Sequence, residues 1–137
     1  YALAPAHVVK SINRIHQYSM LSAPTTAQHA AIEALDNCEP DVEEMCTQYD
    51  RRRNFVLARL DEMGIDCFEA TGAFYVFPKS PWPDAGEFAE ALLQEEQVAV
   101  VPGDAFGTGG EGHLRMSYAS SMDDLRTAMD RIERFLE

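Results

Sequence analysis

The sequence is poor in basic residues. Its 137 residues hold only two lysines, Lys10 and Lys79, and 11 basic residues in all against 23 acidic ones, for a net charge of −12. A nucleic-acid partner needs clustered positive charge, which argues against this function class. The one basic run, residues 51–53, lies among acids and is expected to be a solvated helix face. An acid-rich, lysine-poor surface resembles that of salt-adapted proteins, whose self-repulsion destabilises the fold at low salt.

Paired cysteines and long apolar runs are also missing. Cys38, Cys46 and Cys67 are an odd number without metal-ligand spacing, so we expect no metal site and reduced thiols in a cytoplasmic protein. No apolar run approaches the roughly 20 residues of a membrane helix, and no signal peptide is visible, so no membrane partner is expected. The first residue is Tyr1 rather than methionine, which suggests a segment of a longer protein.

Two helices are expected at the start of the chain. Apolar side chains recur at helical spacing over residues 5–18, and a turn-rich break follows over residues 19–28. A second helix is then predicted up to about Leu35. Together the two helices carry too little apolar surface to be stable alone, so we expect residues 1–40 to be mobile or to dock on another copy of the chain.

From residue 41 onward, helices alternate with pairs of strands. A long helix is predicted over residues 39–63 and ends at Gly64. Asp84 is expected to cap a helix up to about Glu96, and Ser121 with Asp124 is expected to form the capping box of the final helix. The periodicity of two predicts strands over residues 65–68, 72–77 and 113–119, and a run of four apolar residues predicts a further strand, central in its sheet, over residues 98–101. This order predicts an α/β or α+β fold, with helices covering a small mixed sheet.

The segment from residue 98 to 119 is the most informative for function. A strand leads into a loop in which five of the ten residues from Gly103 to Gly112 are glycine, and a second strand then carries Arg115 among apolar neighbours. Glycine gives the backbone conformational freedom. A guanidinium on a rigid strand suits a carboxylate or phosphate, because its fork donates to two oxygens at once. The alternative is a long hairpin connection followed by a surface arginine.

Three motifs carry a resemblance to a known family. They are GAFYVF at 72–77, VAVVPGDAFG at 98–107 and HLRMSYA at 113–119. In this order and spacing, the chain resembles the C-terminal third of a class I/II aminotransferase, a pyridoxal-phosphate-dependent enzyme of fold type I. The resemblance implies that residues 1–40 are the helical end of the large cofactor-binding domain. Residues 41–137 would form the C-terminal small domain.

The resemblance also implies roles for individual residues. The matching arginine of the family binds the substrate α-carboxylate, which assigns this role to Arg115. Phe74 corresponds to the segment that lines the substrate side of the pocket, although a plain strand core is an equal alternative. Ser19 and Thr25 lie in the loop that reaches the neighbouring subunit's cofactor phosphate in the family, with helix capping as their alternative.

The lysine that carries the cofactor in the family has no counterpart here. It lies in a serine-lysine segment just ahead of the part that this chain resembles, and neither Lys10 nor Lys79 has the family context. We therefore expect no catalytic residue in this chain and no activity from the chain alone. The resemblance implies that the complete enzyme is a homodimer that uses pyridoxal phosphate to move an amino group between an amino acid and a 2-oxo acid.

The sequence leaves two other functions open, as well as a purely structural interaction domain. Other fold type I enzymes, such as lyases, decarboxylases and synthases, use a similar small domain and carboxylate arginine. Alternatively, the chain is a stand-alone α/β module that binds a small carboxylate through Arg115. Binding of an amino acid without cofactor would distinguish the module from part of an enzyme.

Overall fold

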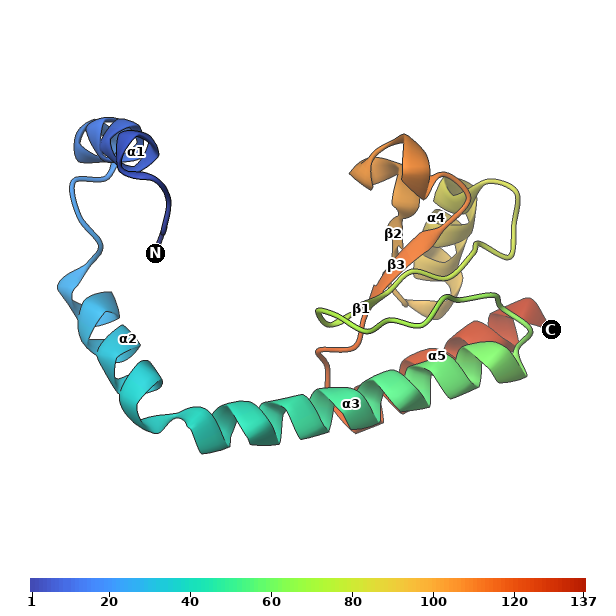
Figure 1. The fold of residues 1–137 in the computed structure, drawn as a ribbon. Coiled ribbons are helices and arrows are strands. Elements are labelled where there is room, and N and C mark those ends of the chain that lie inside the picture. The colour runs from blue at the N-terminus through green and yellow to red at the C-terminus, as the bar shows by residue number, and fades with distance from the viewer. The chain divides into compact units, whose positions relative to one another are not determined.

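The computed structural model describes all residues from Tyr1 to Glu137. The chain divides into two units, Tyr1–Glu43 and Glu44–Glu137, which are described separately below. Figure 1 shows the order of the helices and strands along the chain. No helix combines the length and the apolar character that crossing a membrane would require.

The first unit consists of helices. It contains α1 (Ala6–Ser19), α2 (Thr25–Asn37) and the first turn of α3 (Glu39–Glu62). A proline with extended backbone precedes both α1 and α2, and no side chain caps either helix. Neither helix contains a buried residue. The first unit therefore has no hydrophobic core of its own.

The second unit adds two further helices to α3, and both begin at side-chain caps that the sequence predicts. Before α4 (Ala85–Glu96), the Asp84 carboxylate accepts hydrogen bonds from the backbone N–H groups of Gly86 at 2.8 Å and Glu87 at 3.0 Å. Before α5 (Met122–Leu136), the Ser121 hydroxyl accepts one from the Asp124 N–H at 3.1 Å. Each bond satisfies backbone donors that lack partners in the first helical turn. Both predicted caps are confirmed.

The sheet has three strands in the order β1-β3-β2, namely β1 (Tyr75–Val76), β3 (Leu114–Ser117) and β2 (Val101–Pro102). Tyr75 pairs with Ser117, and Val101 pairs with Arg115, both in antiparallel register. The helices and the small sheet confirm the predicted fold class, but the sheet is antiparallel throughout, so the expectation of a mixed sheet was wrong. Hydrophobic alternation identifies a strand but carries no information about the direction of its neighbour.

The strands are also fewer and shorter than the sequence predicts. Residues 65–68 form no strand, and residues 98–100 lie outside β2. The apolar residues of these segments nevertheless pack against the core, among them Ile65, Val98 and Val100. In both segments every second side chain is turned toward the core, but the ladder of backbone hydrogen bonds that defines a strand is missing.

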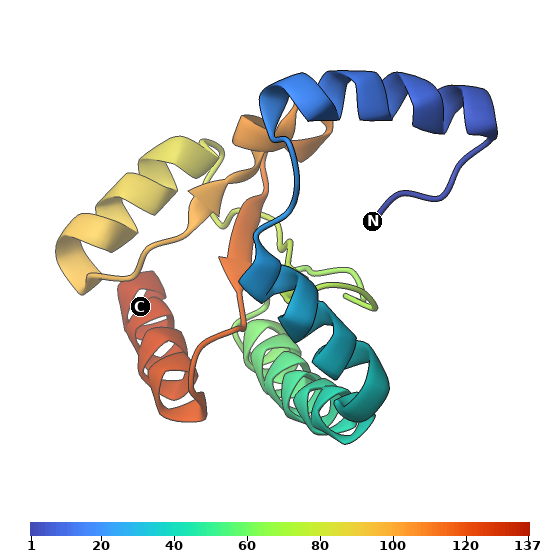
Figure 2. The same cartoon turned by 90° about the vertical axis from the view of Figure 1, so that its left-hand side faces the viewer.

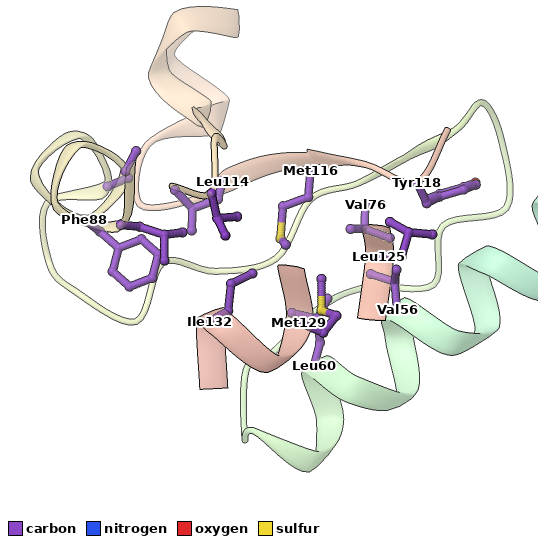
Figure 3. Packing of buried hydrophobic residues seen from close by; sticks show 14 of the residues in the cluster. Val56, Leu60, Val76, Phe88, Leu114, Met116, Tyr118, Leu125, Met129 and Ile132 are labelled. Carbon is purple, nitrogen blue, oxygen red and sulfur yellow. The ribbon is translucent and has the colours of Figure 1, made fainter. Parts of the chain in front are cut away.

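One face of the sheet packs on the helices and forms the core. The strand β3 contributes Leu114 and Met116, and Tyr118 just after it is also buried. Figure 3 shows Leu114 and Met116 directed toward the helices. The helices contribute Val56 and Leu60 from α3, Phe88 and Leu92 from α4, and Leu125, Met129 and Ile132 from α5. In Figure 2, α4 lies beside β2. The predicted alternation along β3 is confirmed, because its apolar residues all face inward.

Ion pairs join the helices at the edge of this core. Arg59 on α3 donates to Asp130 at 2.7 Å and to Glu133 at 2.9 Å, both on α5. The hydrogen bond to Asp130 raises the pKa of Arg59 above its usual value. Arg134 on α5 pairs with Glu96 at the end of α4, and this hydrogen bond lowers the pKa of Glu96. The three helices of the second unit are therefore linked by charge as well as by packing.

Candidate functional site

Arg115 lies on the central strand, on the face of the sheet that points away from the core. Its neighbours Leu114 and Met116 are buried, whereas Arg115 itself is half-buried. It stands directly opposite Val101 on β2 and diagonally across from Tyr75 on β1. The alternation of β3 thus fixes the direction in which the guanidinium projects.

Two aromatic rings from different elements contact this guanidinium. The Cζ atom of Arg115 lies 4.5 Å from the ring centroid of Tyr75 and 4.3 Å from that of Phe106. Both distances are within the range of about 6 Å for a cation–π interaction. Neither Tyr75 nor Phe106 is among the residues that the sequence predicts for the site.

Phe106 belongs to a glycine-rich loop that is folded into two short helices, η1 (Gly103–Phe106) and η2 (Thr108–Gly110). A Cβ atom on Gly110 would lie only 1.9 Å from the carbonyl oxygen of Gly103, and a Cβ on Gly103 would lie 2.2 Å from that of Gly110. Only glycine permits this contact between the two backbones. We expected these glycines to provide flexibility, but two of them are needed for close packing.

Backbone hydrogen bonds hold the loop at the start of β3. The Gly103 N–H donates to the carbonyl of His113 at 2.8 Å, and the His113 N–H donates to that of Gly110 at 3.2 Å. The Phe77 ring stacks on the His113 ring with 5.4 Å between centroids and meets Phe106 edge-on at 6.5 Å. The backbone hydrogen bonds and the contact with the Phe77 ring therefore hold the loop so that Phe106 lies against Arg115.

Phe74 lies in the same aromatic neighbourhood. Its ring centroid is 4.6 Å from that of Tyr75 and 6.0 Å from that of Tyr49, and the residue is 39% exposed. It follows Ala73, which has a positive φ of 57°. The buried Tyr118 hydroxyl donates to the Ala73 carbonyl at 2.8 Å and so holds this turn in place. Burial raises the pKa of that hydroxyl.

Ser19 and Thr25 belong to the first unit. Ser19 is the last residue of α1, and its hydroxyl donates to the Ile15 carbonyl one turn earlier at 2.8 Å. Thr25 is the first residue of α2, where Pro24 occupies the capping position. Both side chains are exposed. Their role toward a cofactor phosphate stays a prediction.

The two lysines and the cysteines have ordinary surroundings. The Lys79 ammonium pairs with Asp66 at 3.1 Å on the surface of the second unit, and Lys10 lies exposed on α1. Burial raises the pKa of the Cys67 thiol, which disfavours the reactive thiolate. Within residues 1–137, no three histidine, cysteine, aspartate or glutamate side chains gather in a way that suits a metal ion.

The sequence of this chain is similar to that of known aminotransferases. The pattern of the family described as aminotransferase class I and II matches residues 1–132. The aromatic-amino-acid aminotransferase 2 of Thermococcus litoralis is 43% identical over 141 residues. The aspartate aminotransferase of Pyrococcus abyssi is 42% identical over 140 residues. These alignments cover 100% and 99% of this chain, but each covers only 36% of the relative.

Solved structures show the same fold. The aromatic aminotransferase from Pyrococcus horikoshii superimposes with a TM-score of 0.92 at 42% identity, over 97% of this chain and 37% of that one. The aspartate aminotransferase from Thermotoga maritima gives a TM-score of 0.89 at 39% identity, over 98% of this chain and 34% of that one. The chain thus spans about a third of the length of the proteins that it matches.

Proposed function

The chain belongs to the aminotransferase class I and II family, whose members depend on pyridoxal phosphate, and from this premise we propose that it is the C-terminal part of a transaminase. In this proposal Arg115 binds the α-carboxylate of the amino-acid or 2-oxo-acid substrate. The complete enzyme is proposed to act as a homodimer.

The placement of Arg115 is the observation that supports this role. Its guanidinium projects from the central strand on the face away from the core, and the rings of Tyr75 and Phe106 contact it. No carboxylate of residues 1–137 pairs with it, although the chain holds 23 acidic residues. Its N–H donors are therefore free to receive a planar carboxylate from outside, with two parallel hydrogen bonds. Such binding would orient the substrate for reaction.

The cofactor would be attached outside these residues. Pyridoxal phosphate, when bound, supplies the electron sink for amino-group transfer. Of the two lysines, Lys79 is paired with Asp66 and Lys10 is exposed on α1. We therefore infer that this chain contributes substrate binding rather than the covalent attachment of the cofactor. Phe74, beside Tyr75, is proposed to line the substrate side of the site.

Replacement of Arg115 in the complete enzyme tests the proposed role. Arg115→Lys keeps the charge but loses the planar fork, so we expect KM for the amino acid to rise about 10- to 100-fold. Arg126→Lys is the matched control, because Arg126 is an exposed arginine on α5 that pairs only with its neighbour Asp123. An unchanged KM in Arg115→Lys would remove the assignment. Release of ammonia or carbon dioxide, in place of transfer of the amino group to a 2-oxo acid, would favour a lyase, decarboxylase or synthase.

The isolated chain provides the second test. We expect residues 1–137 with added pyridoxal phosphate to convert no amino acid to its 2-oxo acid. Conversion by the isolated chain would contradict the proposal that the cofactor is attached outside it. Tight binding of an amino acid without cofactor would instead favour a stand-alone carboxylate-binding module.

A further inference from the structure

We propose that Tyr75 and Phe106 are positioning residues that hold the guanidinium of Arg115 by its faces and leave its N–H donors free for a carboxylate. This inference rests on the proposed role of Arg115. It adds two residues whose contribution is made through Arg115 rather than by contact with the reacting atoms.

Arg115 makes no ion pair with a carboxylate of this chain. Several arginines elsewhere in the second unit use their N–H groups for carboxylates, as Arg59 does with Asp130 at 2.7 Å and Arg126 with Asp123 at 2.7 Å. An acid beside Arg115 would occupy the donors and neutralise the charge. Aromatic rings attract the same cation through their electron-rich faces and use none of its donors. The two rings therefore stabilise the cation while leaving it competent to bind an anion.

The position of Tyr75 is fixed by the sheet. Tyr75 pairs with Ser117, which lies two residues beyond Arg115 on β3. The side chains of Tyr75 and Arg115 therefore project from the same face of the sheet. The Tyr75 ring also contacts that of Phe74 at 4.6 Å, which limits its rotation. The Tyr118 hydroxyl anchors the preceding turn through the Ala73 carbonyl. The Tyr75 ring is thus held in place against the guanidinium.

The position of Phe106 is fixed by the loop. Phe106 is 52% exposed, so burial in the core does not explain where its ring lies. The loop that carries it is closed by the Gly103–Gly110 backbone contact and by the hydrogen bond from Gly103 to His113. The ring rests on Arg115 at 4.3 Å and meets Phe77 edge-on. The close contact of the two glycines is thereby connected to the orientation of the arginine.

A nuclear magnetic resonance measurement on the 15N-labelled chain tests the contacts directly. The Nε–Hε signal of Arg115, identified by its loss in Arg115→Lys, is expected at a ring-current-shifted position. Phe106→Leu should move this signal toward that of Arg126, whereas Phe106→Tyr should retain the shift. Phe106 is suitable because its exposure allows replacement without opening the core. An unshifted signal in the parent chain, or no movement in Phe106→Leu, would overturn the proposal.

A loop variant tests the same contact without altering a ring. Gly110→Ala forces the loop away from Gly103, so the Arg115 signal should move as it does in Phe106→Leu. Gly109→Ala is the matched control, because a Cβ at that position meets nothing within 4 Å. Movement of the signal in Gly109→Ala but not in Gly110→Ala would contradict the proposed link between the loop and Arg115.

Kinetics in the complete enzyme separate this inference from the proposed function. Phe106→Leu and Tyr75→Leu should each raise KM for the amino acid about fivefold, and Phe106→Tyr and Tyr75→Phe should restore it. If Arg115→Lys raises KM but neither leucine variant does, the role of Arg115 stands and the positioning role fails. If Arg115→Lys leaves KM unchanged, the proposed function fails first, and the resonance shift still reports whether the rings hold the guanidinium.

Discussion

The two units of this chain show the same kind of sequence pattern with opposite outcomes. The second unit buries 15 apolar residues in one cluster, and its helix α5 turns its apolar residues into that cluster. In the first unit, α1 carries an equally regular stripe at Val8, Ile12 and Ile15, yet α1 and α2 bury no residue. An amphipathic pattern thus specifies a helix and its apolar face, but it does not specify that the partner of this face lies in the same chain.

Hydrogen exchange should show the largest difference between the units. Core amides of the second unit exchange only through substantial unfolding, whereas isolated helices as short as α1 and α2 are marginal in water. In dilute monomeric chain, we expect the slowest amides of α5 to exchange at least about 1,000-fold more slowly than those of α1. Uniformly high protection across residues 1–40 in a monomer would contradict the comparison.

A pair of truncations at apolar positions should give the next largest difference. Leu60 on α3 is 1% exposed and Ile15 on α1 is 70% exposed. Leu60→Ala leaves a cavity and should lower the free energy of unfolding by about 2–5 kcal/mol. Ile15→Ala should change it by less than about 0.5 kcal/mol. Urea unfolding of both variants measures the contrast, and equal losses would show that α1 shares a core with the rest of the monomer.

A pair of tyrosine variants refines the comparison at a single hydroxyl. Tyr118 is 2% exposed and donates to Ala73, whereas Tyr18 on α1 is 85% exposed. Tyr118→Phe should cost about 1 kcal/mol at neutral pH, because it leaves the Ala73 carbonyl without that donor. Tyr18→Phe should change the free energy of unfolding by less than about 0.5 kcal/mol.

Stability at alkaline pH should depend on the same hydroxyl. Burial raises the pKa of Tyr118 in the folded chain, with a smaller opposing effect of Arg53. The unfolded chain therefore loses this proton first, near pH 10. The stabilising contribution is complete below that pH and is lost as the pH rises through the folded pKa. Between about pH 8 and 11, the free energy of unfolding should fall more steeply with pH for the parent chain than for Tyr118→Phe. An equal fall in both chains would contradict the raised pKa of Tyr118.

The helices were predictable because their signals are local. The expected helix over residues 39–63 is observed as Glu39–Glu62, and the one over residues 84–96 as Ala85–Glu96. Capping side chains and glycine stops act within a few residues of the helix ends, so a single sequence contains them. The strands were less predictable because pairing is decided between distant segments. The apolar alternation of residues 65–68 indicates which side chains are buried, but the backbone hydrogen bond from Lys79 to Asp66 is not extended into the ladder of a strand.

Some residues of the candidate site were likewise predictable from the sequence, and others were not. Arg115 stands out in the sequence as the one charged residue of an apolar strand, and the alternation of β3 gives the face from which it projects. Tyr75 and Phe77 also share a face by their period of two, so that pattern could have drawn attention to Tyr75. Phe106 follows no period, and its place beside Arg115 depends on the contact between Gly103 and Gly110. Such a contact between distant backbones is not visible in the order of residues.

The central position of β3 has a consequence for the assembly of the chain. Both outer strands pair only with β3, and Tyr75 finds its partner at Ser117, near the C-terminal end of the chain. A chain made from its N-terminus must therefore carry Val76 without its partner Met116 while α4, β2 and the glycine-rich loop are synthesised. Pairings between such distant segments carry a loop-closure cost and slow folding. The strand that carries Arg115 is thus also the last of the three to be synthesised, and the sheet cannot form before it.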